Sequence, residues 1–313
     1  MYVERIAPSG RAAWLALRKH DVTASQIGAL FGAHEYLSPY QLWALKSGRF
    51  SDEIDETPVI RRGRMVEPVA VDMLREQFPK WKIDHNAKAN IYFRAPEHRI
   101  GATPDVIVQA PGRGLGVVQI KSVAERTYRQ KWIDDEGQPE APLWIALQAI
   151  QEAYLVGAAW AAVAPLVIGY GIDMPLIEIP LDPGVFEAIK KQVQAFWILV
   201  NSGREPAPDY AMDGELIGSM YGDGDPNHEI DLTGDNRIPE LLAAREAALE
   251  ALRRAKKVLG TVDAEIKSKM GAAHVGHLGQ GRVITWKPER RAGHFVPQST
   301  IRALRYPKDS ANG

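Results

Sequence analysis

Two strand-like segments on either side of a glycine-containing turn constrain the fold of this chain most. The segments are PDVIVQA at 104–110 and LGVVQIKS at 115–122, and the turn PGRG lies between them. Alternating apolar residues in both segments predict an antiparallel hairpin that turns one face toward a core. Counting outward from Gly112, Asp105 and Gln119 face each other across the hairpin, with their Cβ atoms about 5 Å apart.

A third polar residue shares this face of the expected hairpin. Lys121 lies two residues beyond Gln119, so its side chain projects to the same side of the sheet. The hairpin then presents a carboxylate, an amide oxygen and an ammonium group together. A bulge at Gly114 or Gly116 would shift this register.

These groups have the chemistry of a magnesium-dependent phosphodiesterase. Magnesium takes oxygen ligands, which Asp105, the Gln119 side chain, the Ile120 carbonyl and Glu67 can supply. The metal would polarise a phosphate and bind the attacking water, with manganese as a substitute. Lys121 can hold or deprotonate that water and offset the charge on the phosphorane. Taken singly, Asp105 fits the end of a strand, Gln119 an edge polar residue and Lys121 a surface lysine. Taken together, they favour catalysis.

The fourth member of this set, Glu67, lies in a helical pattern that opens at Thr57-Pro58 and continues through Phe78. Pro68 removes one backbone hydrogen bond and predicts a kink or a restart of the helix. The residue before a proline is also biased away from helical geometry. We therefore expect Glu67 at a distortion, which suits a ligand better than a plain surface residue.

The rest of the chain has mixed α/β character. An uncharged run of 20 residues, Ala153 to Ile172, is long enough to cross a bilayer. Gly157, Pro165 and Gly169 interrupt it, so we expect a helix that ends near Gly157 and then a buried strand. The other expected strands are 91–94 and 175–179, and the other expected helices are 123–133, 143–157 and 183–202.

Composition and charge narrow the function classes. The chain has no cysteine, which excludes a disulfide framework, a cysteine nucleophile and thiolate-bound zinc or iron–sulfur sites. The net charge of −1 does not by itself favour DNA. However, the segment from Arg113 to Lys131 carries five basic residues against Glu125 alone, and segregated charge of this kind can form a basic track.

The C-terminal third follows a different pattern. A long helix is expected from Ile238 to Met270, with apolar residues at roughly heptad spacing. Arg245, Lys256 and Asp263 fall on the same seam. For this reason a helix hairpin or a docked arm is expected in place of a regular coiled coil.

A series of short motifs runs in order through residues 10–200. Pro104-Asp105 followed by Gln119-Ile120-Lys121 resembles the PD-(D/E)xK nuclease signature. More closely, the series resembles the YqaJ-like phage recombinase exonucleases, the lambda exonuclease group. The motifs with counterparts there are WLALR at 14–18, TASQIG at 23–28, SPYQLWALKSG at 38–48, GRMVEPVA at 63–70, GATPDVIV at 101–108, VVQIKS at 117–122 and LWIALQAIQEAYLVG at 143–157.

The resemblance implies a role for each matching residue. Glu67 matches the helix glutamate near the metal, Asp105 the main metal ligand and Lys121 the catalytic lysine. Arg18 and Ser25 match residues that bind the 5′ phosphate of a DNA end. Gln148 matches a glutamine on the helix beside the active site.

The resemblance also implies an architecture. It predicts a restriction-endonuclease-like core, a mixed central sheet flanked by helices, with a C-terminal long-helix extension. We expect a nuclease domain at 1–202, an acidic linker or loop at 203–236, and a C-terminal helix with a small basic tail at 237–313.

The activity implied is magnesium-dependent digestion of one strand of linear duplex DNA from its 5′ end. In recombination by annealing, the remaining 3′ overhang passes to a single-strand annealing protein. Some members form a ring, so a homo-oligomer is compatible with the family. We expect no membrane partner, and we expect the cytoplasm of a bacterium or phage-infected bacterium as the location.

One departure from the family pattern concerns Gln119, where most members have glutamate. The change removes one negative charge from the metal site and should weaken magnesium binding. A catalytically weak DNA-binding protein therefore stays open as an alternative. An endonuclease of the same superfamily is a second alternative, independent of Gln119.

Overall fold

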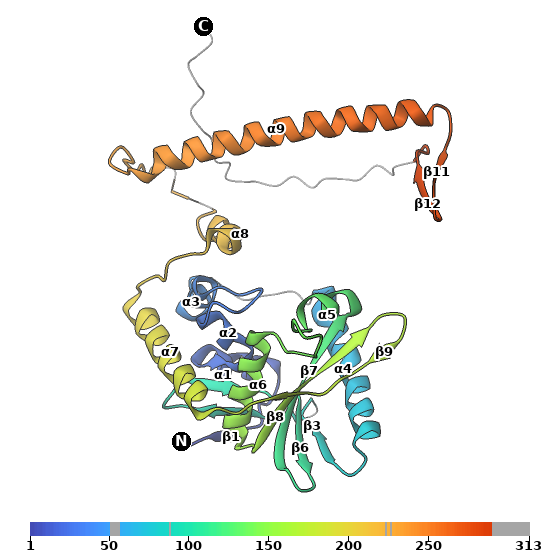
Figure 1. Ribbon diagram of the computed structural model, residues 1–313. Helices are drawn as coiled ribbons and strands as arrows, with labels where there is room; N and C mark the ends of the chain where they lie inside the picture. Colours follow the sequence, from blue (N-terminus) through green and yellow to red (C-terminus); the bar gives the residue numbers. More distant parts are fainter. Residues whose placement is uncertain (51–56, 88, 223, 226, 290–313) are drawn as a thin grey trace. The chain divides into compact units, whose positions relative to one another are not determined.

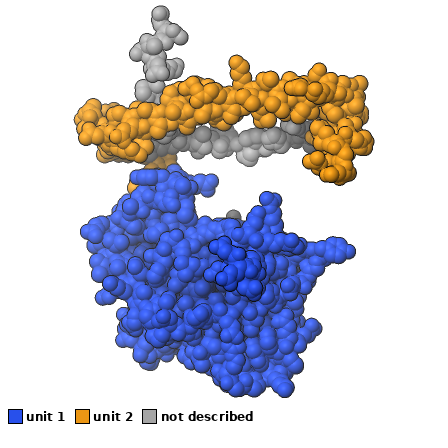
Figure 2. All heavy atoms as spheres, in the orientation of Figure 1, with its two compact units in different colours: residues 1–220 blue, residues 221–313 orange. Residues whose placement is uncertain are grey.

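The structure, a computed structural model, describes residues 1–50, 57–87, 89–222, 224–225 and 227–289 (Figure 1). It forms two compact units, residues 1–220 and 221–313, coloured separately in Figure 2. The last part of the expected basic tail, residues 290–313, lies outside the described residues.

A mixed sheet forms the centre of the first unit. Its strands run in the order β10-β8-β7-β6-β3, with β9 paired to β8. β7 and β8 are parallel, whereas β6–β7, β3–β6 and β8–β10 are antiparallel. The strands are β3 (Lys82–His85), β6 (Val106–Ala110), β7 (Gly114–Ala124), β8 (Trp160–Ile168), β9 (Ile172–Asp173) and β10 (Ile177–Ile179).

A smaller sheet and several helices complete this unit. The smaller sheet has the order β1-β4-β5-β2. Its strands are β1 (Glu4–Ile6), β2 (Val22–Thr23), β4 (Tyr92–Ala95) and β5 (Ile100–Ala102). The helices are α1 (Arg11–His20), the 3₁₀ turn η1 (Ala24–Gln26), α2 (Ile27–Leu30), α3 (Pro39–Ser47), α4 (Pro58–Gln77), α5 (Glu125–Lys131), α6 (Leu143–Val156), α7 (Pro183–Ser202) and α8 (Tyr210–Met220).

Helices cover both faces of the central sheet, as strand alternation requires (Figure 1). Ala162 and Ala164 of β8 belong to the apolar cluster that contains α4. Ala161 and Val163 belong to the larger cluster that contains α6 and α7. The predicted mixed α/β core with helices flanking a central sheet is confirmed.

The uncharged run from Ala153 folds as predicted. Helix α6 ends at Val156, Gly157 adopts a left-handed conformation (φ 75°) as its C-cap, and β8 follows. The described helices include none that is both long and apolar enough to cross a bilayer.

Two local expectations for the first unit are corrected. Helix α4 is one continuous 20-residue helix through Pro68, and Glu67 is helical. The expected restart is wrong, because Ala70, Val71 and Leu74 just beyond the proline are fully buried and hold the helix against the sheet. This packing outweighs one missing hydrogen bond.

The second correction concerns the acidic stretch 203–236, whose first half contains α8. The buried carboxylate of Asp213 accepts hydrogen bonds from Ser38 Oγ (2.5 Å) and from the backbone N–H of Asp209 (2.7 Å). These contacts fasten α8 to the N-terminus of α3, so the first unit extends to residue 220.

The second unit contains α9 (Arg237–Met270), β11 (Val275–Gly279) and β12 (Arg282–Thr285). Helix α9 is a single uninterrupted helix of 34 residues, which confirms the long helix predicted from Ile238 to Met270 and excludes a helix hairpin within that range. The two strands form an antiparallel hairpin of their own.

Candidate active site

The hairpin β6–β7 has the register that the sequence predicts. Val106 pairs with Val118 and Ala110 with Gly114, with no bulge along the ladder. One step beyond the first pair, Asp105 lies opposite Gln119, whose Nε2 donates to Asp105 Oδ2 at 2.5 Å. The backbone N–H of Ile120 donates to the same carboxylate oxygen at 2.9 Å.

Lys121 lies on the same face and points toward helix α6. Its Nζ donates to Gln148 Oε1 at 2.8 Å, and Gln148 Nε2 donates to Glu152 Oε1 at 2.9 Å. Burial lowers the pKa of Lys121, while the carboxylates of Asp105, Glu152 and Glu67 oppose that shift. The amine is therefore easier to deprotonate than an exposed lysine.

Glu67 belongs to a different element, helix α4. Its Oε1 lies 2.7 Å from His85 Nε2 at the end of β3, so its hydrogen bond goes to His85 and not to the hairpin residues. Burial, and next the charge of Glu67, raise the pKa of Asp105 to about 7. Lys121 and the Ile120 N–H partly offset this increase. The carboxylate of Glu67 thus acts on Asp105 through space.

These residues fit a divalent cation by the chemistry of their donors. The Gln119 amide nitrogen is used by Asp105, while Gln119 Oε1 is buried and has no hydrogen-bond partner among the described residues. A cation would satisfy this oxygen and offset the repulsion between Asp105 and Glu67. The Ile120 carbonyl accepts only a long bond from Gln119 Nε2, at 3.3 Å. Within the described chain, no three His, Asp or Glu side chains form a metal-binding group. A metal site here therefore depends on the amide oxygen of Gln119 and the carbonyl of Ile120 in addition to the carboxylates.

The residues expected to bind a DNA end form a second cluster. Arg18 NH2 donates to Ser25 Oγ at 3.4 Å, and the Arg18 guanidinium lies 4.4 Å from the centre of the Trp14 ring. Arg18 lies in the last turn of α1, and Ser25 lies in η1. The structure thus brings Arg18 and Ser25 together at the junction of α1, β2 and η1.

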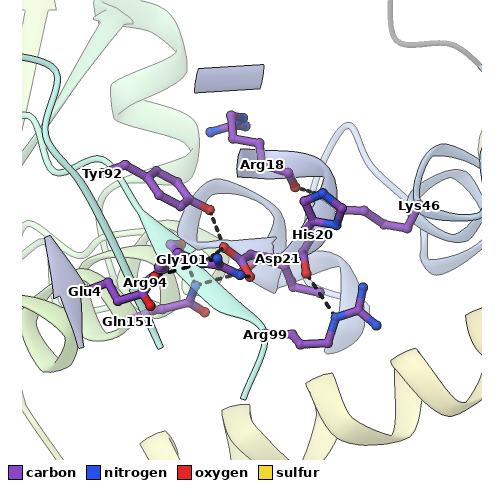
Figure 3. Close-up of polar contacts among 11 residues, drawn as sticks. Glu4, Arg18, His20, Asp21, Lys46, Tyr92, Arg94, Arg99, Gly101 and Gln151 are labelled. Carbon is purple, nitrogen blue, oxygen red and sulfur yellow. Dashed lines mark hydrogen bonds and ion pairs between the residues drawn. The ribbon is translucent and has the colours of Figure 1, made fainter. Parts of the chain in front are cut away.

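A buried ion pair holds this junction (Figure 3). Asp21 is fully buried, and both its oxygens accept from Arg94, at 2.9 and 3.0 Å. Tyr92 Oη also donates to it at 3.0 Å. Burial, followed by the charge of Asp21, raises the pKa of Tyr92 well above its usual range, so the hydroxyl stays a donor. Gly101 is required here, because a Cβ atom would meet the Tyr92 hydroxyl at 2.0 Å.

Two bridges connect the Arg18 cluster with the hairpin site. Trp14 Nε1 donates to Thr103 Oγ1 at 2.9 Å, two residues before Asp105. On the other side, His34 lies 3.2 Å from the Ser25 carbonyl and packs on Trp144, whose ring centre is 5.6 Å from Lys121 Nζ. The two clusters are therefore parts of one region.

Sequence reasoning missed three residues of this region. Glu152 could have been found, because it lies four residues after Gln148 on one helix, which puts both on the same face. His85 and His34 carry no local signal, since each meets its partner only through tertiary packing.

The chain is similar to known proteins in sequence. Residues 13–158 match the YqaJ-like viral recombinase domain. The chain is 24% identical over 283 residues to the uncharacterized protein YqaJ of Bacillus subtilis (strain 168), across 89% of this chain and 83% of that protein.

Two solved structures are similar to parts of the chain. One is an alkaline exonuclease from Laribacter hongkongensis, with 18% identity over 66% of this chain and 99% of that chain, at a TM-score of 0.45. The other is a phage related exonuclease from Haemophilus somnus 129PT, with 13% identity over 64% of this chain and 96% of that chain, at a TM-score of 0.42.

Proposed function

From the match of residues 13–158 to the YqaJ-like viral recombinase domain, we propose that the chain is a magnesium-dependent nuclease of duplex DNA. The observation that carries the proposal is the meeting of Asp105, Gln119 and Lys121 on one face of the hairpin, with Glu67 close enough to raise the pKa of Asp105. Carboxylates beside a partly buried lysine suit phosphodiester hydrolysis better than a structural role.

Each side chain has a part in this chemistry. Glu67, Asp105, Gln119 Oε1 and the Ile120 carbonyl would hold the cation. Magnesium, or manganese in its place, would supply charge that stabilises the scissile phosphate and lowers the pKa of bound water. Lys121, with its lowered pKa, accepts a proton from the attacking water or holds that water in line. Gln148 fixes the position of Lys121 Nζ.

The second cluster favours action from a DNA end. Arginine offers a planar fork that matches phosphate oxygens, and the Ser25 hydroxyl adds a donor beside it. A 5′ phosphate held by Arg18 and Ser25 leads to 5′→3′ digestion of one strand. The product, a 3′ overhang, is the substrate of a single-strand annealing protein in phage-type recombination.

A cleavage assay on linear and circular DNA tests this function. With magnesium, we expect the protein to digest 5′-phosphorylated linear duplex and to leave covalently closed circular duplex intact, because a closed circle has no end for Arg18 and Ser25. Cleavage of the circle would identify an endonuclease instead. If the protein binds DNA but cleaves it in neither magnesium nor manganese, it is a catalytically weak DNA-binding protein, the alternative raised by glutamine at position 119.

Replacement of the end-binding arginine should change the preference between DNA ends. We expect Arg18→Ala to reduce the preference for 5′-phosphorylated over 5′-hydroxyl duplex by about 10–100-fold in kcat/KM, because one charge-assisted phosphate contact is lost. Arg11→Ala, in the first turn of the same helix and exposed, is the matched control. An unchanged preference in Arg18→Ala would remove this residue from the end-binding site.

Restoring a carboxylate at position 119 should strengthen metal binding. We expect Gln119→Glu to lower the magnesium dissociation constant about tenfold by calorimetry, because the donor set gains one negative charge, and to retain cleavage. Without metal, the same variant should unfold at a lower temperature, since the introduced carboxylate would replace a donor to Asp105 with a like charge. Gln109→Glu, exposed on the same hairpin, is the control. A folded Gln119→Glu protein with no metal affinity contradicts the placement of this side chain.

A further inference from the structure

Much of the apolar seam of helix α9 is left exposed by the described residues of its own unit, although Met270 at its C-terminal end lies against Gly276 of β11. The helix has 34 residues, about 51 Å in length, and none of them is buried in the described chain. Leu242, Leu252 and Leu259 on the seam are 37%, 50% and 60% exposed. Helices gain most of their stability by packing such a face, and Gly260 in the interior further lowers the intrinsic stability of this one.

The seam carries a regular heptad pattern with three charged positions. Its a and d positions, in chain order, are Ile238, Leu242, Arg245, Leu249, Leu252, Lys256, Leu259, Asp263, Ile266 and Met270. In a parallel pair of α9 helices in register, Arg245, Lys256 and Asp263 would each face their own copies, which places like charges in the core.

The antiparallel arrangement gives the opposite result. When α9 is laid against a reversed copy of itself with Ile238 opposite Met270, each layer joins two residues whose numbers add to 508. Arg245 then faces Asp263 of the second copy. The remaining layers are Ile238 with Met270, Leu242 with Ile266, Leu249 with Leu259 and Leu252 with Lys256.

In this register four of the five layer types are complementary. Three are apolar on both sides and one joins opposite charges, while the Lys256 stem covers Leu252 and its ammonium reaches solvent. The flanking residues Ala248, Ala255 and Val262 are small or apolar and allow close approach. The register that overlaps the two helices over their full length is thus the one that also matches their chemistry.

We propose that α9 is a dimerisation helix that pairs with α9 of a second copy of this chain in an antiparallel coiled coil, with Arg245 facing Asp263. The charges that disfavour a regular parallel coiled coil specify the orientation and register of the antiparallel one. The proposal does not depend on the nuclease activity of the first unit.

Charge reversal tests the ion pair in the full-length protein. By sedimentation equilibrium, we expect Arg245→Glu and Asp263→Arg each to raise the dimer dissociation constant about 100-fold, because two facing pairs per dimer become like-charged. The double variant should restore it to within about threefold of wild type. Arg254→Glu, on the opposite side of the helix, should leave it unchanged. A monomeric wild type, or single variants that associate like wild type, would overturn the proposal.

Cysteine cross-linking tests the orientation independently, because the chain has no cysteine of its own. Under mild oxidation, Leu249→Cys/Leu259→Cys should give covalent dimers on a denaturing gel, since these two positions face each other. Leu249→Cys alone should not, because its two copies would be about 15 Å apart along the helix. Cross-linking by the single variant would show a parallel pair and refute the proposal. The denaturing readout is unaffected by any assembly through the first unit.

Discussion

Removal of the amine at position 121 is expected to lower the rate of DNA cleavage at least ~10³-fold, since the variant loses both proton transfer and charge stabilisation at the phosphate. Lys121→Ala is the change, and single-turnover cleavage of 5′-phosphorylated linear duplex is the measurement. DNA affinity should change far less than the rate, because the phosphate contact proposed for Arg18 remains.

Two companion variants make this result interpretable. Lys121→Met retains most of the side-chain volume, so its loss of activity cannot come from a cavity beside Gln148. Lys191→Ala removes an exposed lysine from α7 and should cleave at the wild-type rate. If Lys121→Ala digests DNA as fast as Lys191→Ala, the catalytic assignment of the hairpin is wrong.

The second large effect is expected at the buried ion pair of Figure 3. Asp21→Ala should lower the free energy of unfolding of the first unit by about 3–5 kcal/mol, because Arg94 and Tyr92 lose their shared acceptor while remaining largely desolvated. Denaturant titration followed by tryptophan fluorescence measures this change. The end preference should weaken as well, since Asp21 separates α1 from η1 and fixes both.

A surface ion pair provides the comparison for Asp21. Asp72 pairs with Arg75 on α4 at 2.7 Å, with side chains that are 70% and 50% exposed. Asp72→Ala should cost at most about 0.5 kcal/mol, because exposed pairs of this kind contribute little. Equal losses from Asp21→Ala and Asp72→Ala would show that the buried network does not hold the junction.

The elements that the sequence predicted well are those with a local repeat. The facing of Asp105 and Gln119 followed from counting around one short turn, and the structure has that register. Helix α7 has the predicted bounds, 183–202. The end of α6 at Gly157 followed from the conformational freedom of glycine at a helix terminus.

The expectations that failed were those in which packing competes with a local rule. Pro68 predicted a break, yet burial of the residues after it keeps α4 continuous. The acidic stretch after residue 203 has a linker-like composition, but one of its carboxylates, Asp213, is buried against Ser38 and orders α8.

By itself, the sequence determined the face that joins Asp105, Gln119 and Lys121, because strand alternation and turn length are local geometry. It also determined the self-complementary order of charges along α9. Only the tertiary structure decided that Glu67 would form a hydrogen bond with His85. It also decided that Glu152 would accept a hydrogen bond from Gln148, which in turn accepts one from Lys121. The burial of Asp21 against Arg94, 73 residues away, is likewise a result of tertiary packing. These partners come from different elements, and the packing of helices on a closed sheet brings them together.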